Sequence, residues 1–233
     1  MGCTSGKTHV IVVEDKYREL GLRIPSAKEY ESDFEKQAFM TINVIRREPK
    51  LFIPELRRLK SNKLEQLIKK LESIQNDSLC FVDYDQDANQ ACRTNNKNML
   101  KKDQPAPFID LVVIKKEDEW QTNKDMKVKQ DVRKESKKDQ QPSGKGPNTV
   151  IYEKLIAQKN NKAVDALEYT YNQWMGRPHE LILLNMMNEY EKSGEPAEID
   201  PKTSKVGISF LGQNDIGNIF QIIYVKQNSN QIQ

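Results

Sequence analysis

The sequence predicts an α+β fold, because segments with helical spacing of apolar residues occur beside short, apolar, β-branched runs. One segment carries apolar residues at intervals of three and four, which places them on one helix face: Phe34, Ala38, Ile42 and Ile45. Two apolar runs near the C-terminus, residues 205–212 and 218–225, indicate a pair of strands. The residues between them, from Asn214 to Gly217, are typical of a turn.

The composition fits one polar domain with insertions or tails. The chain has 233 residues, of which 36% are hydrophobic and 30% charged, and its net charge is +3. So small a charge does not indicate nucleic-acid binding. No apolar run approaches the ~18 residues that span a bilayer, and the start lacks the apolar core of a secretory signal. Three cysteines, Cys3, Cys80 and Cys92, are too few for a disulfide framework, so we expect a reducing, cytoplasmic location.

The N-terminus carries a possible lipid anchor. After removal of Met1, Gly2 would be free for N-myristoylation, and the adjacent Cys3 could be palmitoylated. The sixth position, where the motif has Ser or Thr, is Gly6. One myristoyl chain binds membranes only marginally, so the second acyl chain would supply the remaining affinity. These residues predict a lipid-anchored peripheral membrane protein; the alternative is an unmodified, disordered start.

We expect an acylation segment with a short strand over residues 1–25, a folded domain over 26–226, and a polar tail over 227–233. A charged, flexible insertion over residues 115–147 interrupts the domain, because its mixed charges leave too little apolar surface to offset the entropy of ordering. An alternative role for this insertion is contact with anionic lipid through its basic residues, Lys134, Lys137 and Lys138.

Local patterns predict the first elements. The apolar, β-branched run His9–Val13 indicates a short strand. Ser26 and Glu29 have the spacing of a capping box, which predicts that the first helix begins near residue 26. Pro49 and Pro54 cannot continue a helix, so the first helix should end before them.

Two more helices and a strand are expected before the insertion. Residues 64–74 carry leucine and isoleucine at helical spacing, and residues 86–99 present one stripe of small or polar residues: Ala88, Ala91, Cys92, Asn95 and Met99. Cys92 is either a small buried residue or a reactive thiol. Phe108–Ile114 indicates a strand.

The second half adds one expected helix and one turn. Its helix is predicted by four residues at intervals of three and four: Val164, Leu167, Tyr171 and Trp174. A short turn containing His179 follows, and then an apolar segment that includes Asn185.

Several of these stretches resemble the CAP superfamily (cysteine-rich secretory proteins, antigen 5 and pathogenesis-related-1), also called the SCP domain. The similar stretches are Asn43-Val-Ile-Arg46 followed by Glu48-Pro-Lys-Leu-Phe52, Ala91-Cys92, Gly146-Pro-Asn148, and Met175–Asn185. With few cysteines and no secretory signal, the chain is most similar in character to the intracellular, Golgi-associated plant pathogenesis-related type. The resemblance implies a three-layer α-β-α sandwich around a small antiparallel sheet.

The resemblance also implies a cleft of two histidines and two acidic residues, which binds a divalent metal in some members. Asn95 stands where the first histidine would be, Pro147 replaces an acidic residue, and His179 corresponds to the second histidine. An amide is a poor substitute for imidazole as a zinc ligand or as a titrating group, and one imidazole does not make a stable zinc site. We therefore expect no metal and no cofactor.

These observations predict a non-catalytic, lipid-anchored CAP-like protein that binds membrane lipid, a protein partner or a second copy of itself, and no nucleic acid. The first alternative is a degenerate hydrolase or metal-binding enzyme that uses His179 with Glu180, Glu168 or Cys92. The second is a scaffold protein that acts through the charged insertion. The structural interpretation of His179 is a hydrogen-bonding residue at a turn.

Overall fold

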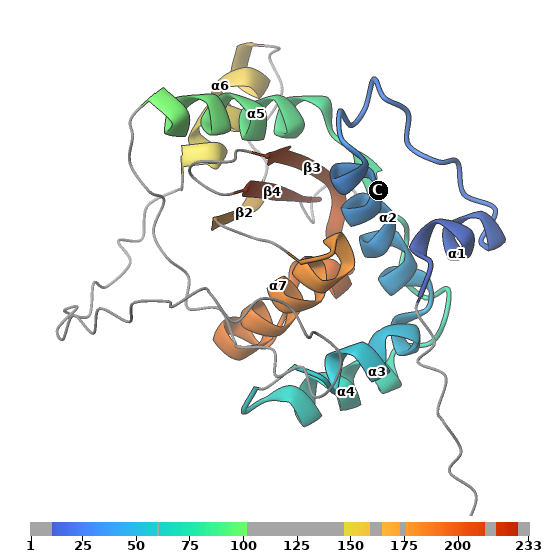
Figure 1. Cartoon of the computed structure of the whole chain (residues 1–233). Helices are drawn as coiled ribbons and strands as arrows, with labels where there is room; N and C mark the ends of the chain where they lie inside the picture. Colours follow the sequence, from blue (N-terminus) through green and yellow to red (C-terminus); the bar gives the residue numbers. More distant parts are fainter. Residues whose placement is uncertain are drawn as a thin grey trace, which may run out of the picture.

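The computed structural model describes residues 11–59, 61–101, 147–158, 165–172, 176–212 and 218–227. These residues form a four-stranded sheet with helices on both of its faces (Figure 1). The helices are α1 (Val13–Glu19), α2 (Asp33–Arg47), α3 (Ile53–Leu56), α4 (Leu64–Ser73), α5 (Gln86–Lys101), α6 (Pro147–Gln158) and α7 (Pro178–Ser193), with 3-10 turns η1 (Pro49–Phe52) and η2 (Ala197–Ile199). The strands are β1 (Asp83–Tyr84), β2 (Asp165–Asn172), β3 (Thr203–Leu211) and β4 (Ile219–Lys226). The expected α+β class is confirmed.

The sheet has the order β1-β3-β4-β2. Strands β3 and β4 pair antiparallel, as the two C-terminal runs predicted, and β2 pairs antiparallel with the other edge of β4. The short strand β1 pairs parallel with β3, so the expected purely antiparallel sheet is corrected to a mixed one. A parallel neighbour needs a long connection between the two strands, and here most of the chain lies between β1 and β3.

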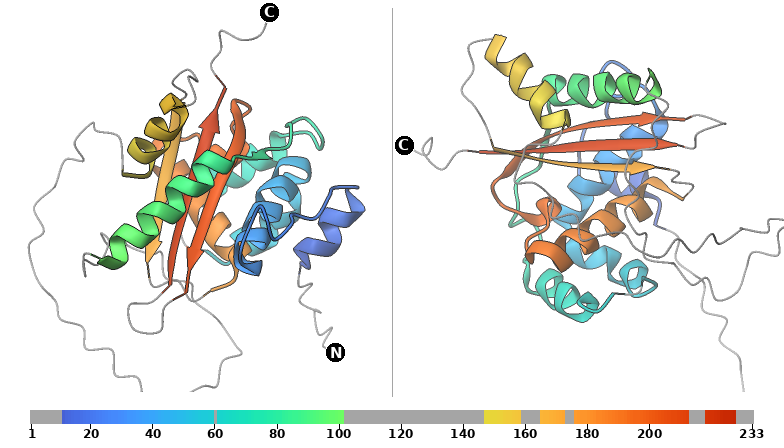
Figure 2. Two further views of the ribbon diagram at one scale, coloured as in Figure 1. Left: turned by 90° about the horizontal axis from the view of Figure 1, so that it is seen from above. Right: turned by 90° about the vertical axis from the view of Figure 1, so that its left-hand side faces the viewer.

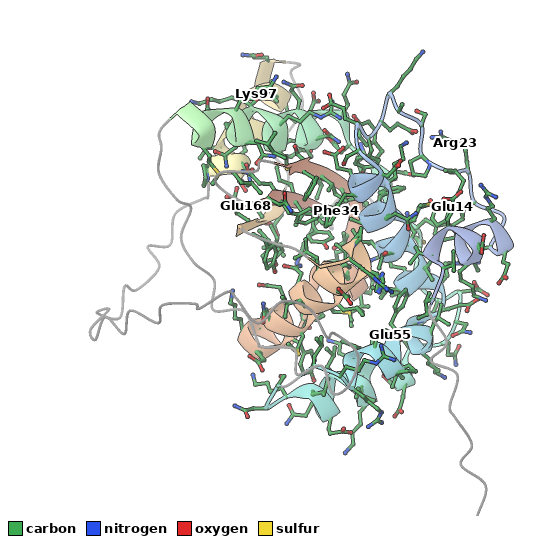
Figure 3. The ribbon with its side chains drawn as sticks, in the orientation of Figure 1. Glu14, Arg23, Phe34, Glu55, Lys97 and Glu168 are labelled. Atoms are coloured by element: carbon green, nitrogen blue, oxygen red, sulfur yellow. The ribbon has the colours of Figure 1, made fainter. Side chains whose placement is uncertain are left out.

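Helices α5 and α6 cover one face of the sheet, and the remaining helices lie on the other face (Figure 2). The main hydrophobic core lies between the sheet and α2 and α7. Phe34, labelled in Figure 3, is partly buried in the first turn of α2 and stacks on Phe210 with ring centroids 4.2 Å apart. A smaller apolar cluster under α5 and α6 includes Ala88, Cys92 and Tyr152. The sheet is therefore buried from both sides.

Helix α2 has the apolar face that the sequence predicted, since Ala38, Ile42 and Ile45 are all fully buried. Its polar residue Asn43 has a structural role: the Asn43 side chain accepts a 2.8 Å hydrogen bond from the Val82 amide and donates one of 3.2 Å to the Val82 carbonyl. This pair of bonds satisfies the backbone just before β1. Asn43 thus fixes the position of the segment that leads into the sheet.

The predicted start of this helix near residue 26 is wrong. Helix α2 begins at Asp33, where Ser32 and Glu35 form a complete capping box. Ser26 and Glu29 do interact, but the Ser26 hydroxyl donates to the Glu29 carboxylate, at 2.9 Å, instead of accepting from a helix amide. The two residues therefore close a turn and do not cap a helix.

Two other expected elements are also corrected. Of the expected strand at residues 9–13, the described residues Ile11 and Val12 have no regular structure, and Val13 begins α1. Val13 and Tyr17 lie one helical turn apart and are both buried, which favours the helix. The expected helix around Leu167 is strand β2. Leu167 and Tyr171 fit both periods, because a separation of four residues returns to the same side of a helix and of a strand.

The predicted helices at 64–74 and 86–99 are confirmed as α4 and α5, and the two C-terminal strands as β3 and β4. Other predictions fall outside the described residues: the acylation site, the strand Phe108–Ile114, the insertion up to Gly146, Val164, Trp174, the turn 214–217 and residues 228–233.

Candidate functional site

The candidate site lies on the face of the sheet beneath α5, where the expected cleft residue Asn95 is found. At the start of this face, α5 approaches β3 very closely. A Cβ placed on Gly207 would lie 2.6 Å from the Cβ of Ala88 and closer still to backbone atoms of Ala88 and Asn89. The Cys92 thiol lies 3.7 Å from the Gly207 carbonyl oxygen. Glycine at position 207 is therefore what allows the helix to pack directly on the strand.

Further along α5, polar side chains replace the apolar contact. We call Asn95, Asn96, Ser209 and Gln221 the amide cluster. Asn95 donates from Nδ2 to Gln221 Oε1, at 3.1 Å, and Asn96 donates from Nδ2 to Ser209 Oγ, at 2.9 Å. Ser209 and Gln221 are paired neighbours on β3 and β4, and all four side chains are buried. The expected cleft residue Asn95 is thus bound to another amide.

Glu168 extends the polar region onto β2, where it lies beside the start of α6 (Figure 3). Its carboxylate accepts hydrogen bonds from the backbone N–H groups of Asn148 and Thr149 and from the Thr149 hydroxyl. Burial raises the pKa of Glu168, and these hydrogen bonds oppose the shift. A carboxylate at a helix N-terminus satisfies free amides and interacts favourably with the helix dipole, so Glu168 holds α6 onto the sheet.

Pro147, the second expected cleft position, is the first residue of α6. Proline is favoured there, because its missing N–H would have no helical partner and its φ already suits the helix. The next side chain, Asn148, is fully buried, and neither its Nδ2 nor its Oδ1 has a hydrogen-bond partner in the described structure. Buried amides are nearly always paired, so Asn148 is the least satisfied polar side chain of this region.

His179, the third expected cleft position, lies in the first turn of α7, and its side chain is partly buried. Burial lowers its pKa; the Glu180 carboxylate raises it and the Arg177 guanidinium lowers it further. Glu180 itself accepts a 2.8 Å hydrogen bond from the Arg177 amide, which caps the helix. The neutral imidazole is therefore favoured, and the neighbouring Glu180 carboxylate caps the helix.

The structure does not join His179 to the partners that the enzyme alternative needs. No hydrogen bond between described residues links it to Glu180, Glu168 or Cys92; Glu168 caps α6, and Cys92 packs on Gly207. Burial raises the pKa of the Cys92 thiol well above its usual value, so Cys92 is a core residue and not a thiolate nucleophile. Within the described ranges, no three His, Cys, Asp or Glu side chains are grouped so that they could hold a metal ion.

Sequence reasoning missed Asn96, Ser209 and Gln221, and their signal was weak. Gln221 is a polar residue inside the apolar run Ile219–Val225, on the side that alternates away from Phe220 and Ile222. That break in the pattern could have indicated a buried polar partner on the covering helix. The identity of the partner depends on which turn of α5 crosses β4, which the sequence does not show.

We expect Asn95→Ala to lower the free energy of unfolding by about 1–3 kcal/mol, because Gln221 Oε1 would lose its buried donor. Asn98→Ala is the matched control, since Asn98 lies exposed on the same helix and its change should cost less than about 0.5 kcal/mol. Urea denaturation of both variants measures the difference. Equal, small effects would mean that the Asn95–Gln221 pair does not stabilise the fold.

Comparison with known proteins adds no assignment: no protein-family model matches the chain, and neither does any curated protein or solved structure. In the part of the chain that the structure describes, no helix has both the length and the apolar character needed to cross a membrane.

Proposed function

We propose that this chain is a non-catalytic, CAP-like (SCP) binding protein, anchored by acyl chains at the cytoplasmic face of a membrane, where it binds lipid or a protein partner. The observation that carries the non-catalytic part is the amide cluster. At the position where the resembled family has a histidine, Asn95 is buried and bonded to Gln221. Neither amide titrates near neutral pH or offers an imidazole nitrogen to a metal.

The arrangement of the described elements supports a CAP-like sandwich. Helices lie on both faces of a small sheet, and the helix with the Asn43-x-x-Arg46 pattern packs beside the sheet and α7. Asn43 and Arg46 are both buried, and both bind backbone groups of distant segments. A domain whose polar side chains form such structural bonds, and in which no described residue forms an acid–base pair with His179, is suited to binding and not to proton transfer.

The Asn148 side-chain amide, which has no hydrogen-bond partner among the described residues, supports a binding role in the same region. A buried amide without partners costs free energy, which a ligand group or a bound water that donates and accepts hydrogen bonds would recover. Asn148 and Thr149 lie in the first turn of α6, and Glu168 already accepts hydrogen bonds from their backbone amides. A bound group would therefore be polar and not an anion, because an anion would meet the Glu168 carboxylate.

The anchor is supported by sequence alone, since Gly2 and Cys3 lie outside the described residues. Membrane fractionation of cells that express the wild type, Gly2→Ala or Cys3→Ser tests it. We expect the wild type to sediment with membranes and both variants to become soluble, because each variant lacks one acyl chain and a single chain gives only marginal binding.

Cys80→Ser is the matched control for this experiment, because Cys80 is an exposed cysteine in the folded domain, far in sequence from the acylation motif. It should sediment like the wild type. If the wild type and all variants remain soluble, the anchor is excluded, and the binding role would have to be sought in the folded domain alone.

A further inference from the structure

The Glu198 carboxyl is completely buried, away from the amide cluster, in turn η2. Its Oε1 accepts hydrogen bonds from Asn185 Nδ2, at 2.6 Å, and from the Tyr224 hydroxyl, at 2.8 Å. Its Oε2 has no hydrogen-bond partner in the described structure. Two donors on one oxygen and none on the other suit a neutral carboxylic acid, in which one oxygen is a carbonyl acceptor and the other carries the proton.

The Glu198 carboxyl connects four elements. Asn185 belongs to α7 and Tyr224 to β4, and Asn185 Oδ1 in turn accepts a hydrogen bond from the Tyr171 hydroxyl on β2. Ionisation of this one carboxyl would therefore change the hydrogen bonds that join η2 to α7 and β4 and, through Asn185, to β2. Buried polar networks of this kind are stabilising only while every strong bond in them is kept.

No ion pair compensates a negative charge on Glu198 among the described residues. The Arg46 guanidinium of α2 attracts a charge on Glu198, but its hydrogen bonds go to backbone carbonyls of the same region, at Glu198, Asp200 and Thr203. Lys226 of β4 pairs with Asp200, at 2.7 Å, and Lys205 of β3 with Asp85, at 3.8 Å.

The other titratable groups that interact with Glu198 do not favour its ionisation. The Glu189 carboxylate of α7 raises the pKa of Glu198, and the remaining groups are phenols of β2 and β4: Tyr169, Tyr171 and Tyr224. Tyr224 stabilises the charged form only through its one hydrogen bond. The Arg46 guanidinium attracts a negative charge on Glu198, but desolvation of the fully buried carboxyl outweighs this attraction, so the ionised form is unfavourable.

We propose that Glu198 is a proton switch built into the fold: while protonated, it holds turn η2 against α7 and β4, and loss of its proton loosens this attachment. Burial raises the pKa of Glu198 from 4.5 to about 7, and the hydrogen bonds from Asn185 and Tyr224 oppose the shift. Because the pKa is higher in the folded than in the unfolded chain, this stabilisation is fully present below pH 4.5 and is lost as the pH rises through 7.

The expected size follows from the shift. Raising the pKa of Glu198 from 4.5 to about 7 changes the folding equilibrium constant by about 300-fold over the whole titration. Between pH 5 and pH 8 alone, the constant changes roughly 70-fold. Glu198→Gln should lose this part of the pH dependence, because a neutral amide keeps an acceptor for Asn185 and Tyr224 but cannot ionise.

The test is denaturant unfolding of the wild type, Glu198→Gln and Glu195→Gln at pH 5 and pH 8. Glu195 is the matched control, since it lies exposed three residues away and its change removes the same charge. We expect the folding constant of the wild type and of Glu195→Gln to fall roughly 70-fold more than that of Glu198→Gln. Parallel pH dependence in all three proteins would overturn the proposal.

A second measurement on the wild type keeps the proposal testable if Glu198→Gln does not fold. Carboxyl resonances of ¹³C-labelled glutamate, and amide exchange of Ala197–Ile199, are followed from pH 5 to pH 8. We expect one glutamate to titrate near pH 7 and the amides to lose protection at the same midpoint, after correction for the intrinsic exchange rate. If no glutamate titrates in this range, or if protection stays unchanged, Glu198 is not a switch.

Discussion

Arg46→Met is expected to lower the free energy of unfolding by about 3–5 kcal/mol, because it removes the donors of one fully buried guanidinium. Arg46 donates from Nη1 to the carbonyls of Glu198, at 3.0 Å, and Asp200, at 3.1 Å, and from Nη2 to that of Thr203, at 3.1 Å. Its Nε donates to the Cys80 carbonyl. Methionine has a similar length but would remove all four hydrogen bonds; of these carbonyls, that of Asp200 keeps a further donor, the Thr203 amide.

Arg47→Met is the matched control for this change. Arg47 is the next residue of α2, but it lies nearer the surface, where it pairs with Asp77 and lies over the Phe81 ring. A partly exposed pair of this kind contributes about 1 kcal/mol or less. Urea denaturation compares the two variants. A loss for Arg46→Met no larger than that for Arg47→Met would contradict the structural role given to Arg46.

Gly207→Ala is expected to destabilise the protein by about 3 kcal/mol, since the new methyl group would overlap backbone atoms of α5 that cannot move alone. The helix would have to shift away from β3. That shift would also disturb the packing of Cys92, which lies against the Gly207 carbonyl. Thermal or denaturant unfolding measures the loss, and the rate at which a thiol reagent modifies Cys92 reports the displacement of the helix.

Gly212→Ala is the control, because a Cβ at Gly212 would lie 3.6 Å from its nearest neighbour, the Asn218 Oδ1 atom, at an ordinary contact distance. It should change stability by less than about 0.5 kcal/mol and leave Cys92 protected. If Gly207→Ala is as stable as this control and keeps Cys92 unreactive, α5 does not pack on β3 as closely as described here.

The spacing of apolar residues was sufficient to predict an element where it fitted a helix alone or a strand alone. The buried face of α2, with Ala38 and Ile42, follows from helical spacing over several turns. Strand β2 was mistaken for a helix because Leu167 and Tyr171 fit either period, and the intervening Tyr169 and Thr170 favour a strand only weakly. Pairing with β4 decided the outcome, and that is a long-range contact.

The candidate site was predicted only in part, for the same reason. Asn95 could be singled out on its helix, but its partner Gln221 lies far away in the sequence and reaches it only through the packing of α5 on β4. Sequence reasoning did not single out Glu198, and only the tertiary structure buries it completely. Burial of a polar group is a property of the whole fold, whereas helical spacing is a property of the segment.

The most direct test of the proposed function is the mass of the N-terminal peptide of the protein purified from eukaryotic cells. The account predicts a myristoyl group on Gly2 and a palmitoyl group on Cys3 that hydroxylamine removes, since a thioester is cleaved and an amide is not. A peptide with an unmodified Gly2 and a free Cys3 thiol would contradict the anchor, and with it the membrane role proposed for this chain.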